Sequence, residues 1–124
     1  MKLTRLLLIA LLFPIAAQAK TGAQLRDDCA PFHERPTPTD MISMMRMQAC
    51  VAYIDGVLDV PILYDIRGAD FDYCVPDGTT RGAASTVVRE FIRRSEVSKM
   101  TWPGSGPQVV INAMREKWPC KATR

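Results

Sequence analysis

Four cysteines carry the most reactive chemistry in this chain. An even number of cysteines in a small exported protein is typical of paired disulfides. A zinc site is the alternative, because thiolates also bind that metal. No two cysteines are close in sequence, and the only histidine, His33, is not at ligand spacing from any of them. The spacing therefore predicts no metal site and two disulfides, formed by Cys29, Cys50, Cys74 and Cys120.

No catalytic constellation is recognisable in the sequence. A serine hydrolase needs a base beside its nucleophile, but His33 lies between prolines and there is no Gly-x-Ser-x-Gly segment. There is no Cys-x-x-Cys redox pair either. Asp65, Asp70 and Asp72 gather carboxylates, the groups that glycosidases use, in one segment. Because no second motif accompanies them, we interpret them as loop charges and expect a non-enzymatic protein without a cofactor.

The N-terminal segment has the pattern of a secretory signal peptide. A basic start precedes an apolar run over residues 6–17, and Ala17-Gln18-Ala19 fits a small-x-small cleavage site. The alternative is a membrane anchor, but the run is shorter than the roughly 20 residues that a spanning helix needs. We therefore predict a signal peptide over residues 1–19, cleavage after Ala19, and export to the periplasm without a membrane anchor. Residues 20–124 are then a single helical domain.

The charge balance gives no indication of a nucleic-acid partner. The whole chain has a net charge of +3 at pH 7, and losing Lys2 and Arg5 with the signal peptide leaves about +1. A basic helix face can bind nucleic acid, and residues 80–95 include such a face. Acidic residues on the same helix dilute it, so we interpret it as a solvated face. Its basic residues are Arg81, Arg89, Arg93 and Arg94.

Apolar periodicity and helix-breaking residues predict an all-α fold. We expect a small bundle of about four helices, stapled by disulfides. The proline-rich segment 31–39 is expected to be an extended connector, because proline disrupts helices. Asp40 is a good N-cap for the principal helix, and Pro61 is expected to end or kink it. The predicted helices cover residues 21–29, 41–60, 80–95 and 107–118.

The principal helix, residues 41–60, is apolar on more than one face. A stripe at three- and four-residue steps contains Ile42, Met45, Ala49, Tyr53, Gly56, Val57 and Val60. A helix that is apolar nearly all round is buried on several sides or contributes to a subunit contact. Its methionines are interpreted as adaptable core filling or as a partner surface. The predicted core or homodimer contacts are Met45, Tyr53, Ile54, Gly56 and Val57.

Helix order suggests which cysteines pair. Four cysteines allow three connectivities. The helices over 80–95 and 107–118 are expected to form an antiparallel hairpin, because their connector is short. A hairpin would bring Cys120 back beside Cys74, which leaves Cys29 to pair with Cys50.

Three ordered motifs between residues 50 and 120 resemble the Rap/Tai family of immunity proteins. The first is Cys50-Val51-Ala52-Tyr53-Ile54-Asp55-Gly56, in which alanine stands where the family tends to have glycine. The second is an aromatic-x-Cys-x-Pro turn, Phe71-Asp72-Tyr73-Cys74-Val75-Pro76. The third is the closing Trp118-Pro119-Cys120. The resemblance implies a periplasmic, helical and often dimeric protein that inhibits a type VI secretion peptidoglycan amidase by covering its active-site cleft.

Such an inhibitor needs a rigid scaffold and a protruding loop, and the sequence offers two. One loop is acidic and contains Asp65, Arg67, Asp70 and Asp72; it could meet a basic cleft rim. The other presents Trp102, a residue type that anchors interfaces. Plain connectors are the alternative for both loops. The competing function is a small periplasmic chaperone of the acid-stress type. Such a chaperone is switched on by acid, and a single histidine changes the charge of the chain little between pH 5 and 8.

Overall fold

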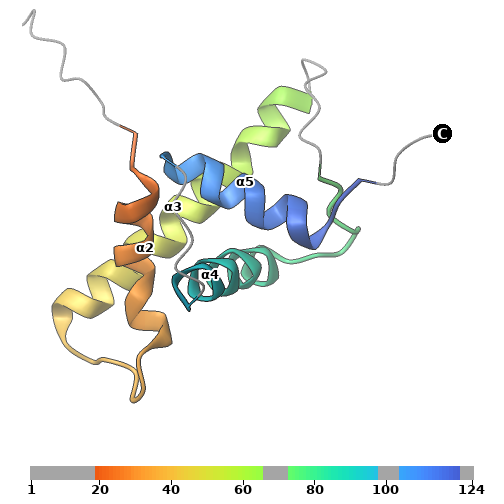
Figure 1. The fold of residues 1–124 in the computed structure, drawn as a ribbon. Helices are drawn as coiled ribbons and strands as arrows, with labels where there is room; N and C mark the ends of the chain where they lie inside the picture. Colours follow the sequence, from red (N-terminus) through yellow and green to blue (C-terminus); the bar gives the residue numbers. More distant parts are fainter. Residues whose placement is uncertain (1–18, 66–72, 98–103, 121–124) are drawn as a thin grey trace, which may run out of the picture.

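The described part of the chain, residues 19–65, 73–97 and 104–120 of a computed structural model, folds into four α-helices and one short 3-10 helix (Figure 1). The prediction of an all-α fold of about four helices is confirmed. The predicted helices are present with boundaries that differ by a few residues. The elements are α2 (Gly22–Cys29), the 3-10 helix η1 (Ala30–His33), α3 (Met41–Asp65), α4 (Arg81–Val97) and α5 (Gly106–Lys117).

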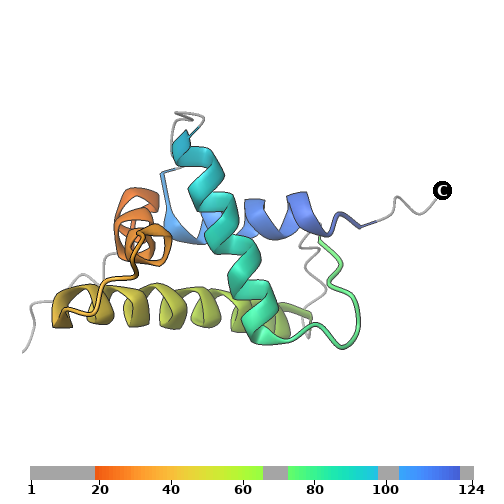
Figure 2. The same ribbon diagram turned by 90° about the horizontal axis from the view of Figure 1, so that it is seen from below.

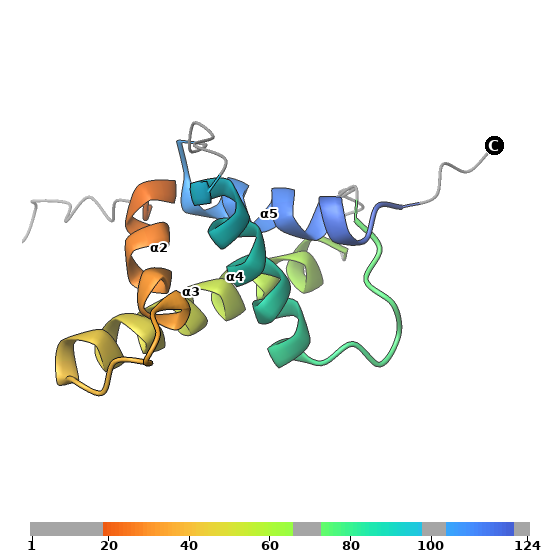
Figure 3. The ribbon, with the colours of Figure 1, turned by 60° about the horizontal axis from the view of Figure 1, so that its bottom comes forward.

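The longest helix, α3, has 25 residues, and the other three α-helices pack against it. α2 and α5 lie on the same side of α3, and α4 crosses α5 steeply (Figures 2 and 3). Figure 1 shows α4 nearly end-on while α5 runs across the view. The predicted antiparallel hairpin of α4 and α5 is therefore wrong, because interdigitating side chains rather than connector length set the crossing angle.

All four α-helices contribute side chains to one hydrophobic core. From α3, Cys50 and Ile54 are 0% exposed, so they mark the face that points inward. The stripe predicted for this helix is displaced from that face, because a helix with apolar residues all round has no periodicity that selects one side. The buried core consists of Leu25, Cys29, Cys50, Ile54, Ala84, Val88, Ile92, Val109, Val110, Ala113 and Met114.

Two helix boundaries depart from the prediction around proline. The principal helix was expected to end or kink at Pro61; it does not end there, because α3 continues to Asp65. Proline removes one backbone donor, yet its fixed φ of about −65° is compatible with a helix. The start of the proline-rich connector also forms the 3-10 helix η1, with Pro31 in its first turn, where the missing N–H has no helical partner to lose.

Asp40 caps α3, as the sequence predicts. Its carboxylate Oδ1 accepts a hydrogen bond from the Ser43 amide at 2.9 Å. This bond lowers the pKa of the Asp40 carboxyl below its ordinary value. In the unfolded chain the carboxyl returns to that ordinary value. Its stabilising contribution is therefore present above the unfolded-state pKa and is lost as pH falls through the folded-state pKa.

We expect Asp40→Ala to destabilise the protein at neutral pH and to have little effect at a pH below the folded-state pKa. Urea unfolding of both proteins at the two pH values measures the difference, and an NMR titration of the Asp40 carboxyl carbon measures the pKa itself. A pKa at or above the ordinary aspartate value, or a destabilisation that persists unchanged in acid, would show that the cap contributes nothing through its charge.

Candidate protein-interaction site

The two disulfides hold the helices in a fixed arrangement. Cys29 at the end of α2 is bonded to Cys50 in α3, with their Cα atoms 5.1 Å apart. Cys74 is bonded to Cys120, with a Cα separation of 4.8 Å. The predicted pairing is confirmed. The Cys29–Cys50 bond lies in the core, and the Cys74–Cys120 bond is exposed. One bond therefore links helices inside the bundle, and the other links two segments at its surface.

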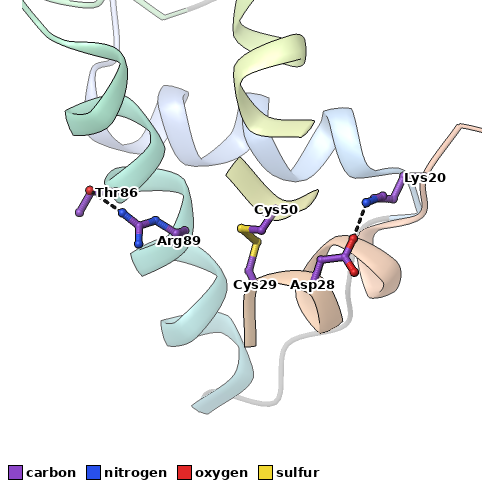
Figure 4. The surroundings of a disulfide bond; sticks show 6 residues. All are labelled: Lys20, Asp28, Cys29, Cys50, Thr86 and Arg89. Carbon is purple, nitrogen blue, oxygen red and sulfur yellow. Dashed lines mark hydrogen bonds and ion pairs between the residues drawn. A yellow bond between two sulfur atoms is a disulfide. The ribbon is translucent and has the colours of Figure 1, made fainter. Parts of the chain in front are cut away.

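The buried disulfide lies between α4 and the Lys20–Asp28 ion pair at the start of the described chain. Figure 4 shows the Lys20–Asp28 ion pair on one side of Cys29–Cys50, and Arg89 of α4 with Thr86 on the other. The carbonyl oxygen of Lys20 accepts a hydrogen bond from the Gly106 amide at 2.8 Å. The Lys20 ammonium also lies 5.1 Å from the centroid of the Tyr53 ring. The first residue of α5 is thus tied directly to the chain ahead of α2.

Gly106 occupies a position with no room for a side chain. A Cβ atom there would lie 2.6 Å from Oη of Tyr53 and 2.9 Å from the carbonyl oxygen of Lys20. The same packing partly buries the tyrosine, and this burial raises the pKa of its hydroxyl. Tyr53 is therefore a packing residue of α3 that seats the start of α5. This contact could not be predicted from the sequence, because its partners come from three separate segments.

The first turn of α3 exposes a group of large apolar side chains, which we call the methionine patch. Figures 1, 2 and 3 show this end of α3 extending beyond α2. The interpretation of these methionines as core filling is wrong, because the core contacts of α3 begin at Cys50. A cluster of this kind on a single chain is typical of an interaction surface. The exposed fractions are 74% for Met41, 68% for Ile42, 49% for Met44 and 66% for Met45.

The predicted core or dimer contacts divide between the inside and the surface. Ile54 is in the core, and Tyr53 and Val57 are partly buried against it. Met45 and Gly56 are exposed, so they do not fill the core. A role for Met45 in a homodimer contact remains a prediction.

The predicted partner-binding residues lie at the limits of the described part of the chain or outside it. Asp65 is the last residue of α3, and its side chain is outside the described part of the chain. Arg67, Asp70, Asp72 and Trp102 also lie outside the described residues. Their assignment to a partner surface therefore stays a prediction.

Three of the four arginines of α4 contact other elements of the fold. Arg81 pairs with Asp59 of α3, and Arg94 pairs with Glu116 of α5 at 2.7 Å. These exposed pairs link neighbouring helices and are each worth about 0–1 kcal/mol. Arg89 instead packs on the ring of Phe32, with its guanidinium carbon 4.2 Å from the centroid. The interpretation of this face as merely solvated is therefore incomplete.

Among the described residues, no group of three or more histidine, cysteine or acidic side chains is placed to hold a metal ion. In the same part of the chain, no helix combines the length and the hydrophobicity needed to cross a membrane.

Comparison with known protein families identifies the family of this chain. A family model described as Rap1a immunity proteins matches residues 21–120. The chain belongs to the Rap1a immunity protein family. The match confirms the resemblance to the Rap/Tai immunity proteins and extends it to the segment before Cys50. No curated protein and no solved structure shows a significant match to the chain.

Membership in the Rap1a family defines the general function. Proteins of this family are immunity proteins against secreted effectors, so the partner of this chain is a protein. They are generally non-enzymatic and typically exported.

Proposed function

We propose that this Rap1a family member is a periplasmic immunity protein that binds and inhibits a type VI secretion peptidoglycan amidase by covering its active-site cleft. An inhibitor of this kind needs a rigid scaffold and an exposed surface that loses water on binding. The observation that carries the proposal is the methionine patch, which belongs to a helix held by a buried disulfide. Methionine side chains adapt to a partner surface because they are unbranched and polarizable.

Export to the periplasm is part of this proposal. We propose that residues 1–19 are a signal peptide cleaved after Ala19, which leaves residues 20–124 as one domain. Two contacts support this boundary: the Lys20 ammonium pairs with Asp28, and the Lys20 carbonyl accepts the Gly106 amide. Cleavage after Ala19 would keep both contacts.

The contact surface is proposed to combine the methionine patch with the acidic loop that starts at Asp65, with Arg67 in that loop and Trp102 as a further anchor. The acidic loop would meet a basic rim of the cleft, and the patch would supply apolar area. A homodimer that buries the patch is the competing use of the same surface. Sedimentation of the free protein distinguishes the two, because a patch used only for the effector leaves a monomer in solution.

Charge reversal of the acidic loop is expected to weaken inhibition of the amidase. The variant is Asp65→Lys/Asp70→Lys/Asp72→Lys, and the expected loss of affinity is ~10-fold or more, because like charges would then face the basic rim. Asp77→Lys, in the exposed turn after Cys74, is the control for a single surface charge change. Unchanged inhibition with a normal helical circular dichroism spectrum would remove the loop from the interface.

A matched substitution tests the methionine patch. Met44→Asp/Met45→Asp places two charges on the exposed side of α3 and is expected to weaken inhibition by ~10-fold or more, because the charges would be buried in the complex. Arg46→Asp, on the same helical turn and also exposed, is the control. Full inhibition by the patch variant would exclude this surface.

The methionine patch also favours one alternative, a small periplasmic chaperone of the acid-stress type. A chaperone would use exposed apolar side chains to hold unfolded clients. Suppression of client aggregation at low pH, with no stable amidase complex, would support this alternative over the immunity function.

A further inference from the structure

A polar pocket lies between the segment that follows α2 and one face of α4. Its volume is about 440 Å³, which is within the range of small-ligand sites. Phe32 and Arg35 line it from one side, and Arg89, Glu90 and Arg93 line it from α4. None of these residues belongs to the methionine patch or to the acidic loop, so the pocket is a separate feature of the surface.

Arg89 is fixed in the pocket wall by two contacts, and one of its N–H groups makes no hydrogen bond within the described residues. Its guanidinium stacks on the Phe32 ring at 4.2 Å, and its Nη2 donates to Oγ1 of Thr86 at 3.0 Å, as Figure 4 shows for the latter contact. Its Nε is buried and lacks a hydrogen-bond acceptor within the described residues. A buried donor without an acceptor is costly, so an acceptor that entered the pocket would be stabilised.

Two of the three arginines that line the pocket have no carboxylate partner among the described residues. Arg35 donates through Nη1 to the carbonyl oxygens of Phe32 at 3.2 Å and Glu34 at 2.9 Å, and these oxygens are uncharged. Arg93, by contrast, pairs with Glu90 at 2.8 Å. Within the described part of the chain, neither Arg35 nor Arg89 forms an ion pair.

We propose that this pocket binds a carboxylate group presented by a peptide. A guanidinium offers a planar fork of donors that matches a carboxylate, and Arg89 is pre-ordered by its stacking on Phe32. The volume leaves space for the side chain or backbone that carries the group. Glu90 also lines the pocket, and its negative charge repels a phosphate dianion more strongly than a singly charged carboxylate.

The carboxylate has two sources, an acidic side chain or a peptide C-terminus, and the test separates them. Arginine Nε–H signals of the purified, disulfide-bonded protein are followed by NMR while a short peptide is added. The probes are an end-blocked peptide with one glutamate, the same peptide with glutamine, a glycine peptide with a free C-terminus, and inorganic phosphate. We expect the Arg89 signal to shift with one or both carboxylate probes and to stay in place with the glutamine peptide.

Variants then assign the binding to the pocket. Arg89→Gln and Arg35→Gln are each expected to weaken binding of the carboxylate probe by ~10-fold or more, as loss of a charge-assisted hydrogen bond does. Arg94→Gln changes the net charge equally on the same helix but outside the pocket, and is expected to change affinity less than ~2-fold. Arg35 is exposed, and its hydrogen bonds within the described residues go to backbone carbonyls, so its variant is informative even if Arg89→Gln unfolds.

Three outcomes would overturn the proposal. They are an Arg89 signal that moves with phosphate alone, equal shifts with the glutamate and glutamine peptides, and equal weakening by Arg35→Gln and Arg94→Gln. Because no amidase is present in the assay, its result does not depend on the proposed immunity function.

Discussion

Replacing Cys29 and Cys50 together with alanine is expected to reduce the free energy of unfolding by roughly 3–5 kcal/mol. The bond closes a loop with a sequence separation of 21 residues, and both cysteines are fully buried. Its loss therefore frees the unfolded chain and also removes sulfur contacts from the core. Total stability of a domain this size is about 5–15 kcal/mol, so the variant should be partly unfolded at 37 °C. Urea unfolding followed by circular dichroism measures the change.

The exposed disulfide provides the comparison. Cys74 and Cys120 are accessible to solvent, so mild reductant should open that bond in the folded protein before it reaches the buried Cys29–Cys50 bond. Mass spectrometry of alkylated peptides reports the order. First labelling of the buried cysteines would contradict their assignment to the core.

Apart from loss of Cys50, Ile54→Ala is expected to be the most damaging single substitution in α3, with a cost of roughly 2–5 kcal/mol. Ile54 is 0% exposed and belongs to the core that α3 shares with the rest of the bundle. Truncation would leave a cavity that the disulfide-held neighbours cannot fill by moving. Thermal or urea unfolding at several protein concentrations measures both the size of the effect and any dependence on association.

Met45→Ala is the matched control for Ile54→Ala, because Met45 lies on the same helix and is 66% exposed. Its effect on unfolding should stay within about 0.5 kcal/mol at every protein concentration. A concentration-dependent loss of stability in Met45→Ala would instead place the methionine patch in a homodimer contact.

The location of the helices was predictable from sequence, because caps, prolines and the amphipathic pattern agree in most segments. Thr21 forms a capping box with Gln24, and Pro107 lies in the first turn of α5. The orientation of α3 was not predictable from periodicity, since apolar residues surround it. Cys50 holds the information instead: once it is bonded inward to Cys29, Ile54 follows one turn later on the same face.

The disulfide pairing was predicted correctly from an incorrect helix arrangement. α4 crosses α5 rather than lying antiparallel to it, yet Cys74 still meets Cys120. A backbone hydrogen bond from the Cys74 amide to the Trp118 carbonyl at 2.8 Å brings the two segments together. The pairing thus depends on the meeting of the segment that precedes α4 with the segment that follows α5. The crossing angle of the two helices has little effect on it.

The two surface features could not be predicted in the same way. Exposure of the methionine patch depends on how far α2 reaches along α3, which is a property of packing. The polar pocket is lined by both Arg35 and Arg89, and these residues are far apart in the sequence. The sequence left two uses open for the methionines, core filling or a partner surface, and the three-dimensional arrangement excludes core filling for Met41, Met44 and Met45.

The central claim, that this Rap1a family protein inhibits a cell-wall amidase, is tested most directly by an activity assay. The purified protein is mixed in equimolar amount with a type VI secretion peptidoglycan amidase whose gene neighbours its own, where one is found, and release of peptide from peptidoglycan is measured. We predict near-complete inhibition at a one-to-one ratio and a complex that survives gel filtration. Full amidase activity in the presence of excess protein, with no complex, would contradict the proposed function.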